Sequence, residues 1–159
     1  MLAEDKEIYY RTYFGQSHDY YYDKLEQYQA GHKFTFNFYA FFLGLPWLLY
    51  RKMNRFALFL ILAVLSQTLL EGVLIKQGLI PENYIVAVER VAMIFWGLVT
   101  GGLANFAYIR QAHREVEKAI ATSPDEETAL AKLSQRGGVT FIPHIILAVM
   151  VIVMILMNR

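Results

Sequence analysis

The sequence contains no cysteine among its 159 residues. Disulfides, thiolate nucleophiles and cysteine-ligated metal or iron–sulfur centres are therefore excluded. The net charge is only +1 at neutral pH, so nothing in the composition suggests a nucleic-acid partner. The sequence also lacks a serine-hydrolase elbow, a Walker loop, an HExxH motif and paired catalytic carboxylates. We therefore predict that the chain is not an enzyme and that it binds no cofactor and no metal.

The order of residues found in a secretory signal peptide is missing as well. Such a peptide begins with basic residues and continues with an apolar stretch. The first ten residues here, MLAEDKEIYY, are acidic and aromatic instead. We expect neither cleavage nor secretion.

What the sequence has in excess is hydrophobic residues, which make up 56% of the chain and are concentrated in blocks. Three of these blocks read as transmembrane helices, because a helix of about 20 residues is about 30 Å long and matches the hydrocarbon core of a bilayer. The sequence therefore predicts an all-α membrane protein with a single membrane domain over residues 1–159. The three predicted spans are residues 56–75, 91–109 and 141–157.

A polar, tyrosine-rich segment, residues 1–33, precedes these blocks. Within it an amphipathic helix is predicted over 17–30, with Ser17 as its N-cap. One face of this helix packs either on lipid headgroups or on the rest of the protein, and the sequence favours neither. That face consists of Tyr21, Leu25 and Tyr28.

A second polar segment, residues 110–140, is predicted to be a cytoplasmic helical loop. The helix of the second span keeps an apolar face as far as Ile120, so we expect it to continue beyond the membrane. The sequence SPDE at 123–126 has the pattern of a capping box with proline at the first helical position. It predicts a second helix from Pro124 to about Gln135.

The stretch 34–55, which we call the aromatic–basic motif, combines eight aromatic residues with a basic cluster. Aromatic rings settle at membrane–water interfaces, and cations anchor on the cytoplasmic side. Its apolar run 38–50 would be about 20 Å long as a helix, which is short for a core of about 30 Å. We interpret the motif as an interfacial or re-entrant helix; a short, tilted fourth span is the alternative. Its interface residues are Asn37, Phe41, Phe42, Gly44, Trp47, Tyr50, Arg51 and Lys52.

Three groups of residues carry a resemblance to a known family: Asn37, Ala40, Phe41, Phe42, Gly44, Trp47, Tyr50, Arg51, Lys52 and Met53; then Gly102, Asn105 and Tyr108; then Gly137-Gly138 before Thr140. They resemble the pattern of the domain of unknown function 2628 family, over most of residues 13–141. One departure is that Leu45 follows Gly44, so the proline is displaced to Pro46. The resemblance implies a small bacterial inner-membrane protein, and it implies no activity.

The distribution of lysine and arginine predicts the orientation. Basic residues cluster at 51–55 and within 110–140, whereas the 76–84 turn contains one lysine. We expect the basic segments in the cytoplasm, the turn on the outer side and the C-terminus outside, in the bacterial inner (cytoplasmic) membrane. Residues 1–33 lie inside if the aromatic–basic motif is re-entrant and outside if it spans.

Glu71 and Arg90 are the charged residues nearest the predicted hydrocarbon region. A charge at membrane depth is costly, so a partner is expected. Both lie towards the outer end of the first hairpin, and we predict that they form an ion pair. The alternative for Glu71 is a place on an ion or proton path.

Small and polar residues predict where the helices pack. Gly97 and Gly101 share a helix face with Asn105, which allows close approach either within one subunit or in a homo-oligomer. Asn105 and His144 lie at similar predicted depths, so a hydrogen bond between their helices is expected. A metal or pH-sensing role for His144 would need ligands that the sequence does not supply.

We predict a non-catalytic integral inner-membrane protein that serves as an accessory, assembly or lipid-interacting subunit. Its expected partners are the lipid bilayer with its anionic headgroups, a second copy of the chain, or another membrane protein. The alternative is a small oligomeric channel or transporter with polar groups such as Gln67 and Glu71 inside the helix bundle. If Gln67 and Glu71 faced the same residues of another subunit in an oligomer, that alternative would be supported. If they contacted a helix of their own subunit, it would be less favoured.

The orientation can be tested with single cysteines at Asn54, Asn83 and Gln135, because the chain has no native cysteine. In intact cells an impermeant thiol reagent should label N83C and leave N54C and Q135C unlabelled, since the basic segments are expected inside. All three should react after the cells are opened. Labelling of N54C or Q135C in intact cells, with N83C protected, would reverse the orientation.

Overall fold

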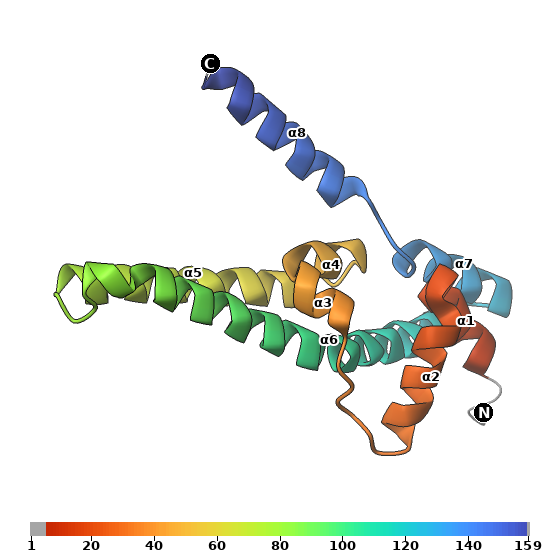
Figure 1. Cartoon of the computed structure of the whole chain (residues 1–159). Helices are drawn as coiled ribbons and strands as arrows, with labels where there is room; N and C mark the ends of the chain where they lie inside the picture. The colour runs from red at the N-terminus through yellow and green to blue at the C-terminus, as the bar shows by residue number, and fades with distance from the viewer. Residues whose placement is uncertain (1–5, 159) are drawn as a thin grey trace.

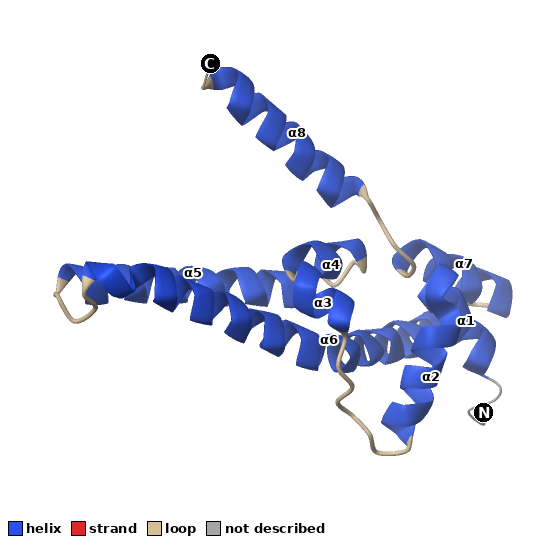
Figure 2. Cartoon of the chain, in the orientation of Figure 1, coloured by secondary structure: helices blue, strands red, loops and turns tan. Residues whose placement is uncertain are grey.

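The computed structural model describes residues 6–158, apart from the side chains of Glu82 and Leu147. Within this range the chain forms helices joined by turns and loops, without a strand, so the all-α prediction is confirmed (Figure 2). Residues 1–5 of the predicted segment 1–33, and Arg159, lie outside the described residues. The helices are α1 (Glu7–Phe14), η2 (Gly15–Ser17), α2 (His18–Gln29), α3 (Phe38–Leu43), α4 (Leu45–Tyr50), α5 (Asn54–Lys76), η3 (Glu82–Tyr84), α6 (Ile85–Thr122), α7 (Glu126–Arg136) and α8 (Ile142–Met157).

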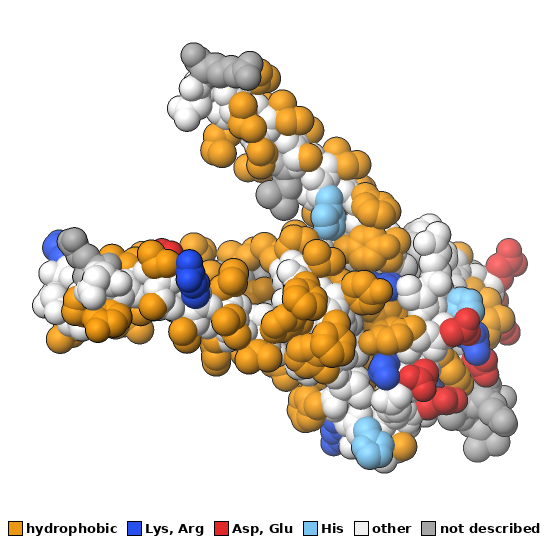
Figure 3. Space-filling model, in the orientation of Figure 1, with side chains coloured by type: hydrophobic (Ala, Val, Ile, Leu, Met, Phe, Trp, Pro, Cys, Tyr) orange, Lys and Arg blue, Asp and Glu red, His pale blue; other side chains and the backbone are white. Residues whose placement is uncertain are grey.

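α5 and the first part of α6 form a long antiparallel hairpin (Figure 1). The most apolar windows of the two helices have mean hydropathies of 2.2 and 1.5, and only 6% and 11% of those windows are buried. Hydrophobic side chains therefore cover the outside of the hairpin, as Figure 3 shows. Both helices are long and apolar enough to cross a membrane. They contain the predicted spans 56–75 and 91–109.

The second half of α6 leaves the hairpin and joins α1, α2 and α7 in a helical head (Figure 1). This continuation was predicted from the apolar face that runs past the second span. In the head that face is buried at Tyr108, Ala112, Val116 and Ala119, a spacing of about one helical turn. Aromatic rings of α1 and α2 pack around Tyr108: ring centroids lie 6.0 Å away for Tyr13, 5.8 Å for Phe14 and 4.6 Å for Tyr21.

The structure decides where the apolar face of α2 packs. Tyr21 and Leu25 are only 2% and 3% exposed. Of the two alternatives for the predicted helix 17–30, contact with the rest of the protein is therefore correct. α1 was not predicted, because its tyrosines made residues 6–14 read as polar. Their rings are nevertheless buried at helical spacing, at Tyr9, Tyr10, Tyr13 and Phe14.

The start of α7 differs from the prediction by two residues. The helix begins at Glu126, and the carboxylate of Asp125 caps it by accepting a hydrogen bond from the Thr128 N–H at 2.7 Å. That bond lowers the pKa of Asp125. A carboxylate interacts more favourably with a helix N-terminus than a hydroxyl does, so Asp125 takes the place predicted for Ser123. Ser123 instead accepts a hydrogen bond from Lys132 at 3.0 Å.

Glycines join the end of α7 to α1. The Gly138 N–H donates to the carbonyl oxygen of Tyr13 at 2.7 Å. A Cβ atom at Gly137 would lie 2.0 Å from the same oxygen, and one at Gly15 would lie 3.1 Å from the Cα of Gly138. The backbones therefore approach so closely that only glycine fits at position 137.

α3 and α4 lie where the hairpin meets the head (Figure 1). In α3, Phe41 packs against Gly97 of α6. After α4, the carbonyl of Lys52 accepts a hydrogen bond from Gln111, which lies about 21 Å nearer the head along α6. The chain thus runs into the hairpin along α3 and returns along α4, reversing at Gly44, where φ is +52°.

α8 contains the predicted third span 141–157 and projects away from the hairpin (Figure 1). It contacts α4 near its first turn. Its 16 residues make a helix about 24 Å long, which is short of the hydrocarbon thickness of a bilayer. Two helices in the described residues thus have the length and composition of a span, where three were predicted.

The close approach at Gly137 can be tested with alanine substitutions. Gly137→Ala should destabilise the protein by about 1–3 kcal/mol, because its methyl group would overlap the Tyr13 carbonyl. Gly102→Ala is the matched control: no atom lies within 4 Å of its Cβ position, and alanine favours a helix by about 1 kcal/mol. Thermal unfolding in mild detergent, followed by circular dichroism, should show a lower midpoint for G137A alone. Equal midpoints for the two variants would contradict the packing.

Candidate functional site

The aromatic–basic motif begins with a buried polar contact between Asn37 and α6. The side-chain oxygen of Asn37 caps α3 by accepting from the Ala40 N–H at 2.9 Å. Its amide nitrogen donates to the side-chain oxygen of Asn105 at 2.9 Å, and its main-chain N–H donates to the Gly101 carbonyl at 2.8 Å. Asn105 in turn donates to the Thr35 hydroxyl at 3.0 Å. Asn37 and Asn105, both predicted site residues, thus fix α3 to α6.

The glycine face of α6 receives α3. A Cβ atom at Gly97 would lie 3.2 Å from the Phe41 ring, and one at Gly101 would lie 2.8 Å from the Phe36 ring. Two alternatives were open for this face, packing within one subunit and packing in a homo-oligomer. In the structure α3 of the same chain covers it.

Arg51 is the most deeply enclosed cation of the motif, at 6% exposed. Its guanidinium lies 4.5 Å from the ring centre of Tyr21, 5.6 Å from that of Tyr50 and 5.7 Å from that of Tyr108. It donates one hydrogen bond to the Ser17 hydroxyl at 2.8 Å, so Ser17 does not cap α2 with its side chain. Its Nε and Nη1 atoms have no hydrogen-bond partner among the described residues.

The ring faces around Arg51 stabilise its charge by cation–π attraction in place of a carboxylate. Burial also raises the pKa of Tyr21 to about 12, and that of Tyr13 in the same ring cluster to about 12. The tyrosines therefore stay protonated and uncharged at neutral pH. They cannot act as anionic partners of Arg51.

Lys52 has a left-handed backbone conformation, with φ at +56°. Its ammonium group donates to the carbonyl oxygens of Gln135 and Gly137 at 2.9 and 2.6 Å. The end of α4 is thereby joined to the end of α7. Arg51 and Lys52, predicted to project towards lipid headgroups, are instead used inside the protein. Arg51 and Lys52 are held in these positions by their partners in the head. Those partners are distant in the sequence, so the local pattern does not reveal them.

The outer face of the motif is aromatic. Trp47 is buried and faces inward, while Phe42, Tyr39 and Phe38 are 77%, 74% and 68% exposed. Only part of the predicted interface set therefore points outward, and Tyr39 and Phe38 belong to that surface although they were not in the set.

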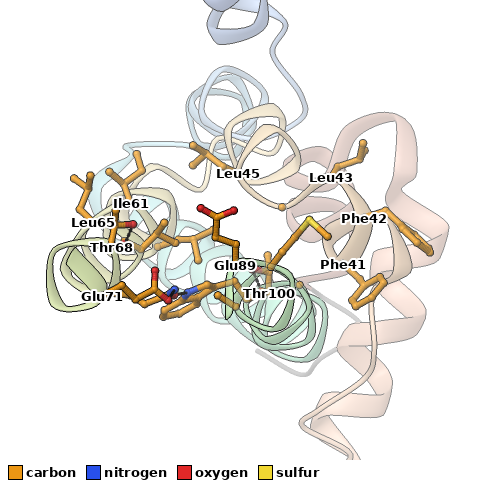
Figure 4. Close-up of a pocket in the computed structure, with 18 residues that line it drawn as sticks. Phe41, Phe42, Leu43, Leu45, Ile61, Leu65, Thr68, Glu71, Glu89 and Thr100 are labelled. Atoms are coloured by element: carbon orange, nitrogen blue, oxygen red, sulfur yellow. Dashed lines mark hydrogen bonds between the residues drawn. The ribbon is translucent and has the colours of Figure 1, made fainter. Parts of the chain in front are cut away.

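A cleft of about 590 Å³ lies between α3, α4, α5 and α6, and Figure 4 shows Glu71 and Glu89 among its lining residues. The predicted Glu71–Arg90 ion pair is not among the salt bridges of residues 6–158. Glu71 accepts a hydrogen bond from Gln67 at 2.7 Å, and Gln67 accepts one from the Trp96 indole. Gln67 lies one helical turn from Glu71 on the same helix, and this local partner replaces the distant one.

The predicted hydrogen bond between Asn105 and His144 is also not formed. His144 is carried away from α6 by α8, and its ring packs against Tyr50 and Phe141 at 6.3 Å from each ring centre. Its Nδ1 atom is buried without a partner among the described residues. Asn105 is occupied by Asn37 and Thr35.

Residues outside the predicted set complete the connection between head and hairpin. Gln111 donates to the Tyr13 hydroxyl at 2.8 Å and to the Lys52 carbonyl at 3.3 Å. No local pattern marks Gln111, because its two partners lie far away in the sequence. Among the side chains that the structure describes in residues 6–158, which leaves out Glu82, no three of histidine, aspartate or glutamate are close enough to hold a metal ion.

The arrangement defines an all-helical protein with two helices that can cross a membrane and a buried arginine at their base. The sequence model of the family described as "Protein of unknown function (DUF2628)" matches residues 6–114. The chain belongs to this family, and the resemblance noted in the sequence is confirmed. A search of curated proteins and a search of solved structures each gave no match.

The pair that is in contact, Asn37 and Asn105, and the pair that is not, Glu71 and Arg90, should behave differently in double-mutant cycles. Asn37→Ala and Asn105→Ala should show a coupling energy of about 0.5–2 kcal/mol, because the two amides bond directly. Glu71→Gln and Arg90→Gln are the comparison pair and should add within about 0.5 kcal/mol, because no salt bridge joins them. Unfolding by a denaturing detergent measures both cycles. Coupling in the second pair together with additivity in the first would contradict the structure.

Proposed function

We propose that the chain is a non-catalytic integral protein of the bacterial inner membrane and serves as an accessory, assembly or lipid-interacting subunit. One observation carries the proposal: α5 and the hairpin part of α6 expose apolar side chains on their outer surfaces, while the polar head gathers at one end (Figure 3). Leaving so much apolar surface in water would be unfavourable, and lipid would cover it.

The path of α3 and α4 favours the re-entrant interpretation of the aromatic–basic motif. α3 begins beside Gly101 and Asn105, and the chain after α4 returns to the level of Gln111, so residues before and after the motif lie at the same end of the hairpin. We place that end, with its basic residues, in the cytoplasm. α8 would then be a third, short crossing with the C-terminus outside, which requires local thinning of the bilayer.

The outward-facing rings suggest what the motif does. Phe38, Tyr39 and Phe42 would lie among lipid chains near the interface, where aromatic side chains are favoured. Because Arg51 and Lys52 are engaged by other parts of the protein, the lipid contact that we propose for Phe38, Tyr39 and Phe42 is aromatic rather than electrostatic.

The channel or transporter alternative receives less support. Gln67 accepts from Trp96 and donates to Glu71 within one subunit. This is the arrangement that counts against a polar pathway between subunits. We therefore retain the accessory or lipid-interacting role.

The proposal is tested by membrane extraction combined with cysteine labelling. The protein should remain in the membrane fraction after carbonate washing, because apolar helices hold it there. Gln16→Cys, at an exposed site before α2, should be protected from an impermeant reagent in intact cells, like Asn54→Cys. Release by carbonate would refute the integral location. Labelling of Q16C in cells where N54C is protected would mean that the motif spans the membrane.

A further inference from the structure

A basic pocket of about 610 Å³ lies where α5 begins, beside the second half of α6 and the end of α7. Its lining contains cations from all three helices and one carboxylate. The charged residues are Lys52, Arg55, Arg114, Lys118, Arg136 and Glu115. Such an excess of one sign in a concave site attracts anions.

Most of this positive charge is uncompensated. The Glu115 carboxylate accepts a hydrogen bond from Arg136 at 2.9 Å, and this pair neutralises one cation. Lys52 is bonded to main-chain carbonyls, which carry no net charge. Among the salt bridges formed by residues 6–158, none involves the other cations of the pocket, Arg55, Arg114 and Lys118. Four positive charges therefore face the pocket without a carboxylate partner.

A second pocket of about 400 Å³ continues from the basic one towards the hairpin. Arg55, Gln111 and Arg114 line both, so the two are contiguous. The far side of the second pocket is apolar, and its rings and aliphatic side chains belong to Phe56, Phe59, Leu103 and Phe106. The combined surface is thus basic towards the head and apolar towards the hairpin.

The surface changes from apolar beside the hairpin to basic beside the head, which is the order expected from the hydrocarbon of a membrane to its headgroups. Along α6, Phe106 and Arg114 are separated by about 12 Å, more than the roughly 5–8 Å that headgroups add on each side of a bilayer, so Phe106 can lie among acyl chains while Arg114 lies among headgroups. A free phosphate would use the basic half alone. A phospholipid has a phosphate joined to acyl chains and would use both halves.

We infer that this surface binds an anionic phospholipid, with the phosphate among Arg55, Arg114 and Lys118 and an acyl chain along Phe59 and Leu103. The inference rests on the proposed membrane location and adds the ligand class and the residues that bind it. The side chain of Arg55 on the first turn of α5 links the two halves, because it lines both pockets.

The test uses the full-length protein in mild detergent and native mass spectrometry. Three probes are added separately: phosphatidylglycerol, phosphatidylcholine and inorganic phosphate. The wild type should bind phosphatidylglycerol more tightly than phosphatidylcholine. Arg55→Gln/Arg114→Gln should lose roughly 30-fold in affinity for phosphatidylglycerol, the factor for two cations at about 1 kcal/mol each. Lys76→Gln/Arg90→Gln, with the same charge change at the other end of the hairpin, should bind like the wild type.

A gain-of-function variant keeps the test independent of folding defects. Glu115→Gln removes the only carboxylate of the pocket and frees Arg136, so its affinity for phosphatidylglycerol should rise. Equal binding of the two lipids, with no effect of R55Q/R114Q or E115Q, would overturn the inference. Displacement of phosphatidylglycerol by equimolar inorganic phosphate would overturn the lipid assignment. Retention in carbonate-washed membranes, measured in parallel, tests the proposed function separately.

Discussion

The enclosure of Arg51 by aromatic rings is the contact on which the arrangement of head and hairpin depends. Its guanidinium touches rings of α2, α4 and α6, and its one hydrogen bond reaches the Ser17 hydroxyl between α1 and α2. A buried cation without a carboxylate is costly unless its surroundings compensate. The N-terminal segment supplies part of that compensation, through the ring of Tyr21 and the hydroxyl of Ser17. Its helices therefore pack at the base of the hairpin and nowhere else along it.

The parts of the fold that follow from local pattern were accessible from the sequence. Hydrophobicity located both helices of the hairpin, although α6 begins at Ile85 where residue 91 was predicted, and an apolar face extending to Ile120 predicted that α6 continues beyond the second predicted span. α1 was missed because tyrosine is polar at one end and apolar along its ring, and only packing around Tyr108 shows which property is used. Asp125 was missed as the N-cap of α7 because both the Ser123 hydroxyl and the Asp125 carboxylate in SPDE can accept a hydrogen bond from the first turn. The carboxylate interacts more favourably with the helix dipole, and it caps the helix in the structure.

The candidate site shows where sequence reasoning ends. Aromatic and basic residues in close succession predicted an interface, yet Arg51 and Lys52 are engaged within the protein, by contacts to residues between 30 and 85 positions away. The Glu71–Arg90 and Asn105–His144 pairs failed for a related reason. The predicted depth of two residues in a membrane indicates only whether their side chains could meet. Which partner each side chain has depends on the rotation of its helix and on competition from nearby groups, such as Gln67 for Glu71. Asn37 was recognised as a site residue, but its partner Asn105 follows only from the path of α3.

The uninterrupted helix α6 connects the hairpin rigidly to the head. At 38 residues the helix is about 57 Å long, and it belongs to the hairpin at one end and to the head at the other. A change of about 10° in its tilt would move the far end of the head by about 10 Å relative to the turn at Gly78. In the membrane location that we propose, a change in bilayer thickness that altered the helix tilt would thus displace the head along the membrane surface. No turn or loop interrupts α6 between Ile85 and Thr122, so the hairpin and the head would move together.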